Sequence, residues 1–204
     1  MSGIIGLIKW VLIALGAFTA YYMVMFQVQY GFTSKFIGEY ISPTLHEKSM
    51  DVYMDMATTL LDTGDITMAT IVRDKVADDI SIEDVEEAMS SIATDLQIKE
   101  VGMLPLSEQV ELQLGEKQRF LKIYQYCKPT TAMTMVDHSD AFSAYLPCRI
   151  ALIEDKDGKK WLYSLNMDMM IYGGAPLPAD LYELALQVKD TITSIQKGGA
   201  AGDF

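Results

Sequence analysis

The chain has 204 residues, half of them apolar, and a formal net charge of -12. This length allows one domain of ordinary size with appendages. Recognition of a nucleic-acid backbone requires clustered Lys and Arg, and the largest such cluster is Lys159-Lys160, so the composition excludes a nucleic-acid partner. The acidic balance also disfavours docking onto anionic lipid.

The N-terminal stretch Ile4–Phe26 is apolar and interrupted only by Lys9. As a helix it spans roughly 30 Å, the thickness of a bilayer core, so residues 1–27 are predicted to form a single transmembrane anchor. A cleaved signal peptide is the alternative, but the run continues past Ala20 without a small-residue cleavage site. The residues expected at the membrane interface are Lys9, Trp10, Tyr21 and Tyr22.

Charge placement around this stretch predicts its orientation. Lys9 precedes most of the span, whereas Lys35 and Glu39 follow it and offset each other. The positive-inside rule then places the N-terminus in the cytoplasm and the following domain in the periplasm of a bacterium. The bilayer of the bacterial inner membrane is therefore the first expected partner.

Residues 28–64 are expected to connect the anchor to the domain, with an amphipathic helix over Thr44–Leu61. A globular domain is predicted over residues 65–197. It begins with a β-branched strand, Ile66–Val76, followed by a helix whose start at Ser81 carries a capping box with Asp84.

Three further elements precede the middle of the domain. Ile98–Leu104 is predicted to be a short strand, and Ser107–Leu114 a short helix that ends at Gly115. In the next strand, Phe120–Cys127, the uncharged alternate positions are Leu121, Ile123, Gln125 and Cys127. This alternation predicts that Cys127 faces the core.

The last strands form a predicted hairpin. Cys148–Glu154 and Lys160–Met167 flank Asp157-Gly158, which is typical of a two-residue turn with positive φ at both positions. A final helix is predicted from Pro178 to Lys197, ended by Gly198-Gly199, with a C-terminal tail over residues 198–204.

The segments YQYCKP, AYLPCRIALIEDKDG and KWLYSLN resemble the family called domain of unknown function 302. The resemblance covers roughly residues 66–170 and rests on a Cys-x-Pro after one strand and a Leu-Pro-Cys that opens the next. It implies an α+β fold similar to the TATA-box-binding protein, β-α-β4-α, often paired as dimers, without an established activity. The structural residues that it implies, together with the turn, are Cys127, Pro129, Pro147, Cys148, Asp157 and Gly158.

The two cysteines are the best candidates for a site. They match no zinc spacing, and they could form a redox pair or bind a soft metal. They could equally be buried apolar residues or a disulfide between neighbouring strands. Structural roles are favoured.

Methionine and histidine extend the possible soft-metal set. Thioethers suit Cu(I), although methionine is also a common core filler, and His138 in a polar turn has no nucleophile motif nearby. The candidate ligands are Cys127, Cys148, His138, Met167, Met169 and Met170.

Two functions are compatible with these features. The favoured hypothesis is a membrane-anchored, non-catalytic interaction or accessory subunit whose partners are other membrane-protein subunits or further copies of the chain. The alternative is periplasmic binding or redox handling of a soft ligand, such as copper, haem or a sulfur species, through the candidate ligands. An enzyme of unassigned reaction is the third possibility.

Overall fold

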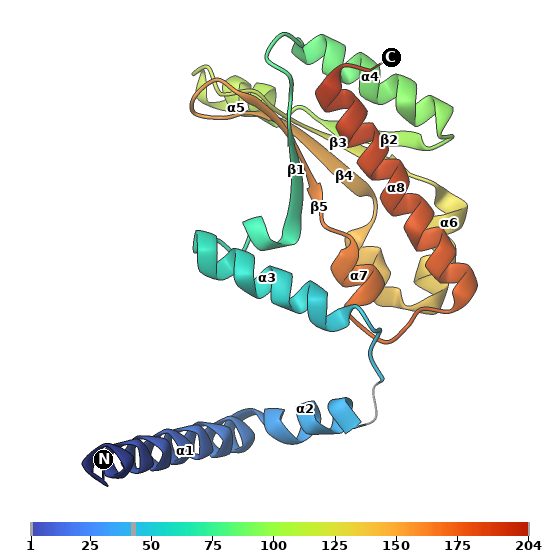
Figure 1. Ribbon diagram of the computed structural model, residues 1–204. Coiled ribbons are helices and arrows are strands. Elements are labelled where there is room, and N and C mark those ends of the chain that lie inside the picture. Colours follow the sequence, from blue (N-terminus) through green and yellow to red (C-terminus); the bar gives the residue numbers. More distant parts are fainter. Residues whose placement is uncertain (1, 42–43, 204) are drawn as a thin grey trace. The chain divides into compact units, whose positions relative to one another are not determined.

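The computed structural model describes residues 2–41 and 44–203. The chain divides into two compact units, residues 1–46 and 47–204 (Figure 1). The first holds α1 (Ser2–Tyr30) and α2 (Phe32–Ile41). The second holds α3 (Ser49–Thr63), η1 (Met68–Thr70), β1 (Ile71–Lys75), α4 (Ile82–Asp95), β2 (Lys99–Leu104), α5 (Leu106–Leu114), β3 (Leu121–Cys127), α6 (Pro129–His138), η2 (Asp140–Tyr145), β4 (Cys148–Glu154), β5 (Lys160–Leu165), α7 (Asp168–Tyr172) and α8 (Ala179–Ala201).

Helix α1 is long and apolar enough over Gly3–Tyr30 to cross a membrane. It continues past the predicted end at residue 27, because nothing in the sequence breaks the helix before Gly31, where φ is 60°. The segment expected to be a connector contains a second helix, α2. The predicted interface residues Lys9, Trp10, Tyr21 and Tyr22 are all exposed along α1.

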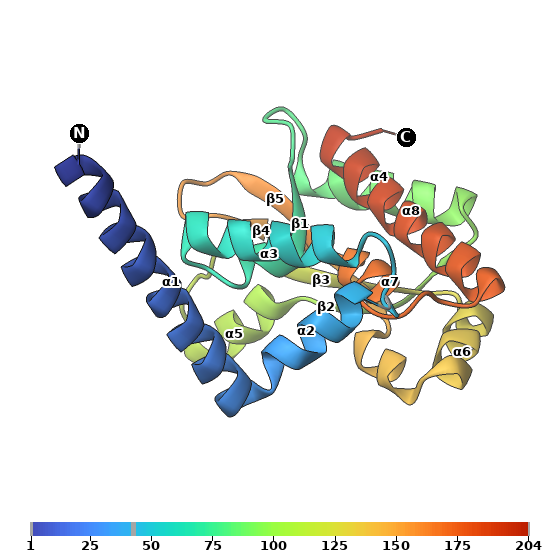
Figure 2. The same cartoon turned by 60° about the horizontal axis from the view of Figure 1, so that its bottom comes forward.

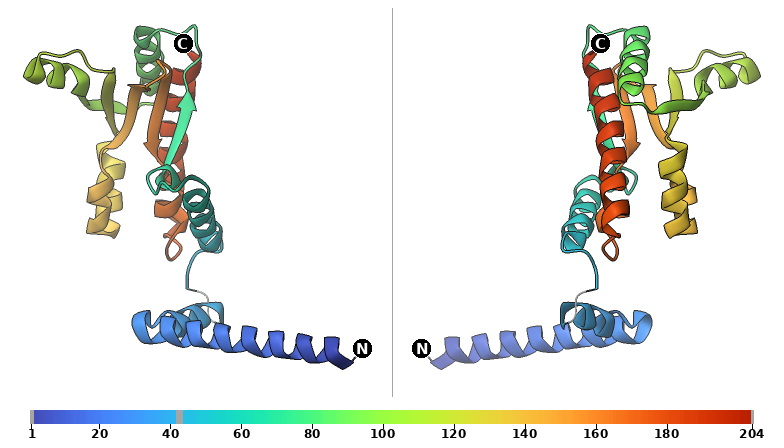
Figure 3. Two further views of the ribbon diagram at one scale, coloured as in Figure 1. Left: turned by 90° about the vertical axis from the view of Figure 1, so that its left-hand side faces the viewer. Right: turned by 90° about the vertical axis from the view of Figure 1, so that its right-hand side faces the viewer.

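The second unit is a mixed α+β domain built on one antiparallel sheet of five strands, in the order β1-β5-β4-β3-β2. Helices α4 and α8 lie side by side across one face of this sheet (Figure 2). In Figure 3 the right-hand view shows α8 in front of the strands, whereas in the left-hand view no helix crosses their middle. The sheet therefore has one covered face and one open face.

The start of the domain differs from the prediction in two places. Helix α3 ends at Gly64 in the left-handed conformation, and strand β1 begins only at Ile71 rather than at Ile66. The reason lies in Asp65, whose carboxylate accepts hydrogen bonds from the backbone N–H and the hydroxyl of Thr67 at 2.8 and 2.7 Å. These bonds hold the intervening residues in a turn rather than in a strand.

The core lies between the sheet and the helices α4 and α8. Its fully buried side chains come from both layers: Val76, Val85, Met89, Tyr126, Ile150, Leu152, Leu162 and Ile195. The capping box at the start of α4 is confirmed, since the Ser81 hydroxyl accepts from the Asp84 N–H and the Asp84 carboxylate accepts from the Ser81 N–H. Burial of each large apolar side chain contributes roughly 1.5–3 kcal/mol, and this packing orients α4 on the sheet.

The predicted end of the last helix is wrong. Gly198 and Gly199 lie inside α8, which runs to Ala201, and both are buried. Because they have no side chains, the backbone of α8 approaches Ile92 and Met89 of α4 closely at this point. The gain from helix packing outweighs the preference of glycine for a helix end, and the tail begins only at Gly202.

The inward face of β3 is the opposite of the predicted one. Tyr124 and Tyr126 are buried beneath the helices, whereas Cys127 is only half-buried. Lys122 also lies on the helix side, because Glu86 of α4 accepts a hydrogen bond from its ammonium at 2.6 Å and another from the Tyr124 hydroxyl. One carboxylate from α4 thus makes the polar set of alternate positions compatible with burial.

The β4–β5 hairpin forms, but its turn is not the predicted two-residue type. The Asp155 N–H donates to the Lys159 carbonyl at 2.8 Å, which leaves three residues in the loop. Only Gly158 has a positive φ, 77°. The Asp155 carboxylate accepts from the N–H groups of Asp157 and Lys159, and this side-chain network selects the longer turn.

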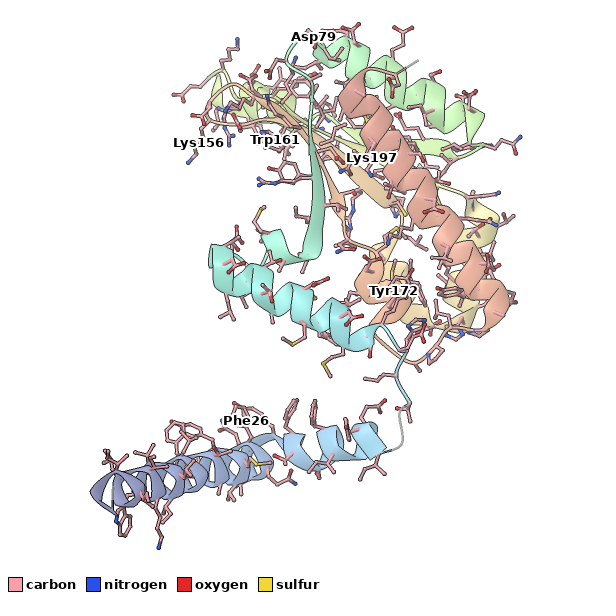
Figure 4. All side chains as sticks on the ribbon, viewed as in Figure 1. Phe26, Asp79, Lys156, Trp161, Tyr172 and Lys197 are labelled. Atoms are coloured by element: carbon pink, nitrogen blue, oxygen red, sulfur yellow. The ribbon has the colours of Figure 1, made fainter. Side chains whose placement is uncertain are left out.

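Helix α3 is attached to α7 in the second unit. The Tyr53 hydroxyl donates to the Gly173 carbonyl at 2.5 Å, and the Lys48 ammonium lies 5.1 Å from the ring centre of Tyr172, which Figure 4 labels. The same ring has the Lys189 ammonium at 5.7 Å. These contacts fix α3 beside the lower end of the sheet.

The glycine contact in α8 gives a first prediction. A Cβ added at Gly199 would lie 2.5 Å from Met89 Cγ and 3.3 Å from Leu162 Cδ1, so Gly199→Ala should lower the free energy of unfolding by about 1–3 kcal/mol. Gly174→Ala is the control, since nothing lies within 4 Å of its added Cβ. Denaturant unfolding of the detergent-solubilised protein measures both variants, and equal stabilities would contradict the close approach.

The Glu86 carboxylate, which accepts hydrogen bonds from Lys122 and Tyr124, gives a second prediction. Replacing Glu86 by Gln removes the charge partner of Lys122, whose side chain is 16% exposed, and should lower the free energy of unfolding by about 1–3 kcal/mol. Glu87→Gln on the exposed side of α4 makes the same chemical change and should have little effect. A matching loss in the two variants would show that the Lys122–Glu86–Tyr124 contacts do not hold α4 in place.

Candidate functional site

Both cysteines line one small cavity at the lower end of the sheet. Cys127 is the last residue of β3, and Cys148 is the first residue of β4, where it lies opposite not Cys127 but Tyr126. The cavity has a volume of about 30 Å³, enough for one or two water-sized groups. Its lining is otherwise mostly apolar and includes Met135, Met167, Met170, Phe142 and Val188.

The family-motif prolines lie at the two ends of this region. Pro129 is the first residue of α6, which is the position where a missing N–H costs nothing. The Leu146–Pro147 peptide is cis and leads directly into Cys148. Helix α6 begins two residues after Cys127 and η2 ends three residues before Cys148, so residues of the segment between the two cysteines line the cavity.

Both thiols are free, and both cysteines are half-buried. Burial raises the pKa of Cys127, and burial together with the nearby Cys127 thiol raises the pKa of Cys148 to about 11. Both groups are consequently neutral thiols near pH 7. A nucleophilic cysteine, in contrast, is activated by a lowered pKa.

Four of the six residues proposed from the sequence as soft-metal ligands come together here. Cys127, Cys148, Met167 and Met170 all line the cavity. The other two do not: His138 is exposed at the end of α6 with its ring centre 6.3 Å from that of Phe142, and Met169 is 40% exposed. Met169 lines a separate cleft of about 390 Å³ between α3 and the sheet.

Met135 is the cavity residue that the candidate ligand set lacked. It is buried in α6 together with Thr131, one helical turn earlier, whereas Met133 is exposed. The helical period of Pro129–His138 carries this information, because it places Thr131 and Met135 on one face and Met133 on another. In a strand, by contrast, Met133 and Met135 would lie on the same face, so the Met-x-Met spacing alone does not single out Met135.

The open face of the sheet is the second candidate feature. Cross-strand register places the following side chains together on it: Ile71, Leu104, Leu121, Ile123, Ala151, Ile153, Trp161, Tyr163 and Leu165. Each of them is at least partly exposed. The same face contains a groove of about 280 Å³, lined by residues that include Ile123, Ala151 and Tyr163.

Charge on the open face is of one sign. The register adds Arg73, Lys75, Lys99 and Arg149 to it, and none of its strand residues that the structure describes is acidic. Arg73 lies 4.9 Å over the ring of Trp161, and Trp161 Nε1 donates to Asp155 at 2.9 Å. Figure 4 labels Trp161; it also labels Lys197, which lies on α8 and so on the covered side of the sheet. A chain of net charge -12 thus leaves an apolar surface rimmed by cations.

Residues 74–197 match the family model "Domain of unknown function DUF302". The chain belongs to this family. The crystal structure of an uncharacterized conserved DUF302 protein from Bacillus stearothermophilus is similar in fold, with a TM-score of 0.51 at 12% sequence identity. The similarity covers 63% of the present chain and 97% of that one. No curated protein matches the chain. The family match includes both cysteine motifs and the whole sheet except the first residues of β1.

The raised pKa values predict slow alkylation of the DUF302 cysteines. With a pKa of about 11, Cys148 is about 0.1% thiolate at pH 8, so iodoacetamide should modify it at least about 100-fold more slowly than an unfolded cysteine. The rate should rise about tenfold per pH unit up to pH 10, because the thiolate fraction grows as the pH approaches the pKa. Mass spectrometry follows the reaction, with the denatured chain as control. Rapid modification of Cys148 in the folded protein at pH 8, located by peptide mapping, would contradict a buried neutral thiol at this position.

Proposed function

We propose that this DUF302 protein is a single-pass protein of the bacterial inner membrane whose domain faces the periplasm and acts as a non-catalytic interaction module. In this role it is an accessory subunit of a larger membrane complex. The observation that carries the proposal is the open sheet face, which leaves a broad, partly exposed apolar surface with cationic side chains among its strand residues. Exposed apolar patches of this kind are typical of protein–protein contact sites.

The N-terminal helix supports the membrane part of the proposal. Its 29 residues correspond to about 44 Å, more than the roughly 30 Å of a bilayer core. Lys9 is its single charged residue and lies near its start. By the positive-inside rule this favours a cytoplasmic N-terminus, with the domain on the other side.

The order of the elements supports the similarity to the TATA-box-binding protein. Strand β1, helix α4, four strands and helix α8 follow one another as in β-α-β4-α, with α5, α6 and α7 as additions between them. The function inferred here differs from that of a nucleic-acid-binding sheet. The chain is strongly acidic overall, and a duplex would meet that charge around the few cations of the open face.

The raised pKa values of the two thiols fit a non-catalytic interaction module better than a hydrolase or a thiol oxidoreductase. Catalytic cysteines depend on a lowered pKa, whereas burial raises the pKa of both Cys127 and Cys148. The enclosed volume beside them, about 30 Å³, is far below the roughly 300–1,000 Å³ of ordinary substrate pockets. Cys148 also lines the groove of about 280 Å³ on the open face, whose volume lies just below that range.

A charge placed on the open face tests the proposal. Leu165, 41% exposed at the end of β5, is replaced by Glu, and Leu112 of α5, 87% exposed, receives the same change as control. The protein is extracted from its native membrane in mild detergent and sized. We expect the unchanged and Leu112→Glu proteins to migrate in an assembly larger than one chain, and Leu165→Glu to migrate alone, because burying an unpaired carboxylate at a contact is costly.

Two results would count against the proposal. A lone, stable monomer for the unchanged protein would remove the interaction function. Release of the full-length protein from membranes by carbonate washing would remove the anchor and leave the open face to be explained in a soluble protein.

A further inference from the structure

Five sulfur-containing residues line the cavity at the lower end of the sheet. Two are the cysteines Cys127 and Cys148, and three are the methionines Met135, Met167 and Met170. They come from β3, β4, α6, α7 and the residue that precedes α7. We propose that this cavity, hereafter the sulfur cavity, binds a single monovalent copper ion.

The donor set selects a soft cation. Thiolate and thioether sulfur favours Cu(I), whereas Mg²⁺, Ca²⁺ and Mn²⁺ prefer carboxylate and carbonyl oxygen. The lining contains no carboxylate and no imidazole. Within residues 2–41 and 44–203, no three His, Cys, Asp or Glu side chains are grouped so as to hold a metal. A tetrahedral zinc site, which needs four such ligands or three with water, therefore does not fit, while a sulfur-coordinated monovalent ion does.

The volume restricts the ligand to one ion. About 30 Å³ accommodates a metal ion that draws the surrounding sulfurs inward, and it is more than tenfold too small for a haem or for most organic ligands. Haem, one of the soft ligands expected from the sequence, is excluded from this cavity on size. Cys127 is only half-buried, so an ion has a path to the cavity from the surface at the end of β3.

The use of methionine as a core filler would explain Met135 or Met167 taken alone. It would not explain why three methionines and two cysteines line one cavity. The sulfur cavity lies where two core clusters meet: Cys148 packs on the cluster beneath the sheet, and Met135, Met167 and Met170 belong to the one formed with α7 and α8. A filler side chain closes the space that it faces. Here three methionines and two cysteines line a space of about 30 Å³ that stays unfilled.

Charge balance is compatible with copper. Each thiol that binds the ion loses its proton to solvent, so that one Cu⁺ and two thiols give an anionic bis-thiolate centre and two protons. Lys128 follows Cys127 directly and lines the cavity with an exposed side chain. Arg149 likewise follows Cys148 directly, and the two cations offset the remaining negative charge. The thioethers add neutral donors and no further charge.

The test uses the full-length, detergent-solubilised protein under anaerobic, reducing conditions. Cu(I) is supplied as its bicinchoninate complex, whose colour reports the copper that the protein removes. We expect one equivalent to bind, with an X-ray absorption spectrum that fits sulfur neighbours alone. Cys127→Ser/Cys148→Ser should abolish this transfer, and Met167→Leu/Met170→Leu, which keeps the side-chain volume, should weaken it at least about tenfold.

Met133→Leu/Met169→Leu is the matched control, because both of these methionines are exposed and lie outside the cavity. It should bind copper as tightly as the unchanged protein. Thermal unfolding of each variant in the absence of copper shows that it is folded. Full copper transfer to the cysteine double variant, equal weakening by the two methionine pairs, nitrogen or oxygen neighbours in the spectrum, or no transfer to the unchanged protein would each overturn the proposal. Its outcome is independent of the sizing experiment, since Leu165 does not line the sulfur cavity.

Discussion

The architecture depends on the close packing of α8 against α4 and the sheet. Gly198 and Gly199 permit it, because any side chain at these positions would meet Ile92 or Met89. Once the two helices cover one face, the alternation of every central strand is fixed, with Tyr126, Ile150 and Leu162 inside. The side chains on the open face are therefore determined by which alternate strand positions face the helices.

The face of the sheet beneath α4 and α8 buries several polar side chains. Lys122 and Tyr124 would be costly to bury alone, and Glu86 of α4 satisfies both with one carboxylate. Gln196 of α8 also has a partner in the sheet, because its side-chain amide donates a hydrogen bond to the Asp74 carboxylate at 2.8 Å. Polar groups of the sheet are therefore directed toward the helices. The open face is left with apolar side chains and with cations that have no carboxylate among their strand neighbours, which is why it is the more plausible contact surface.

The sulfur cavity follows from the register of β3 and β4. Pairing of Tyr126 with Cys148 brings the second cysteine to the end of β3, beside Cys127. Helix α6 then returns over this end with Met135 on its buried side, and α7 brings Met167 and Met170 from the other direction. The sulfur cavity and the groove of the open face adjoin each other, since Cys148, Met167 and Met170 line both.

The sequence by itself determined the local structure and the composition of the parts. The apolar run of α1, the capping box at Ser81, the helix end at Gly115 and the existence of the β4–β5 hairpin follow from short-range rules, because each depends on residues within one turn of the chain. The family could also be identified, since its cysteine motifs are local.

Only the tertiary structure decided which face of β3 is buried, where α8 ends, and which sulfurs meet. The polarity of Tyr124 argued against its burial, but Glu86 of α4, 38 residues away in the chain, accepts a hydrogen bond from its hydroxyl. Gly198-Gly199 is a helix end by propensity and a packing contact by tertiary structure. Met135 lines the cavity and His138 does not, because His138 is the last residue of α6 and is exposed at its end, whereas Met135 lies within the helix and is buried. Contacts between distant residues, absent from any local pattern, are the physical reason for each of these differences.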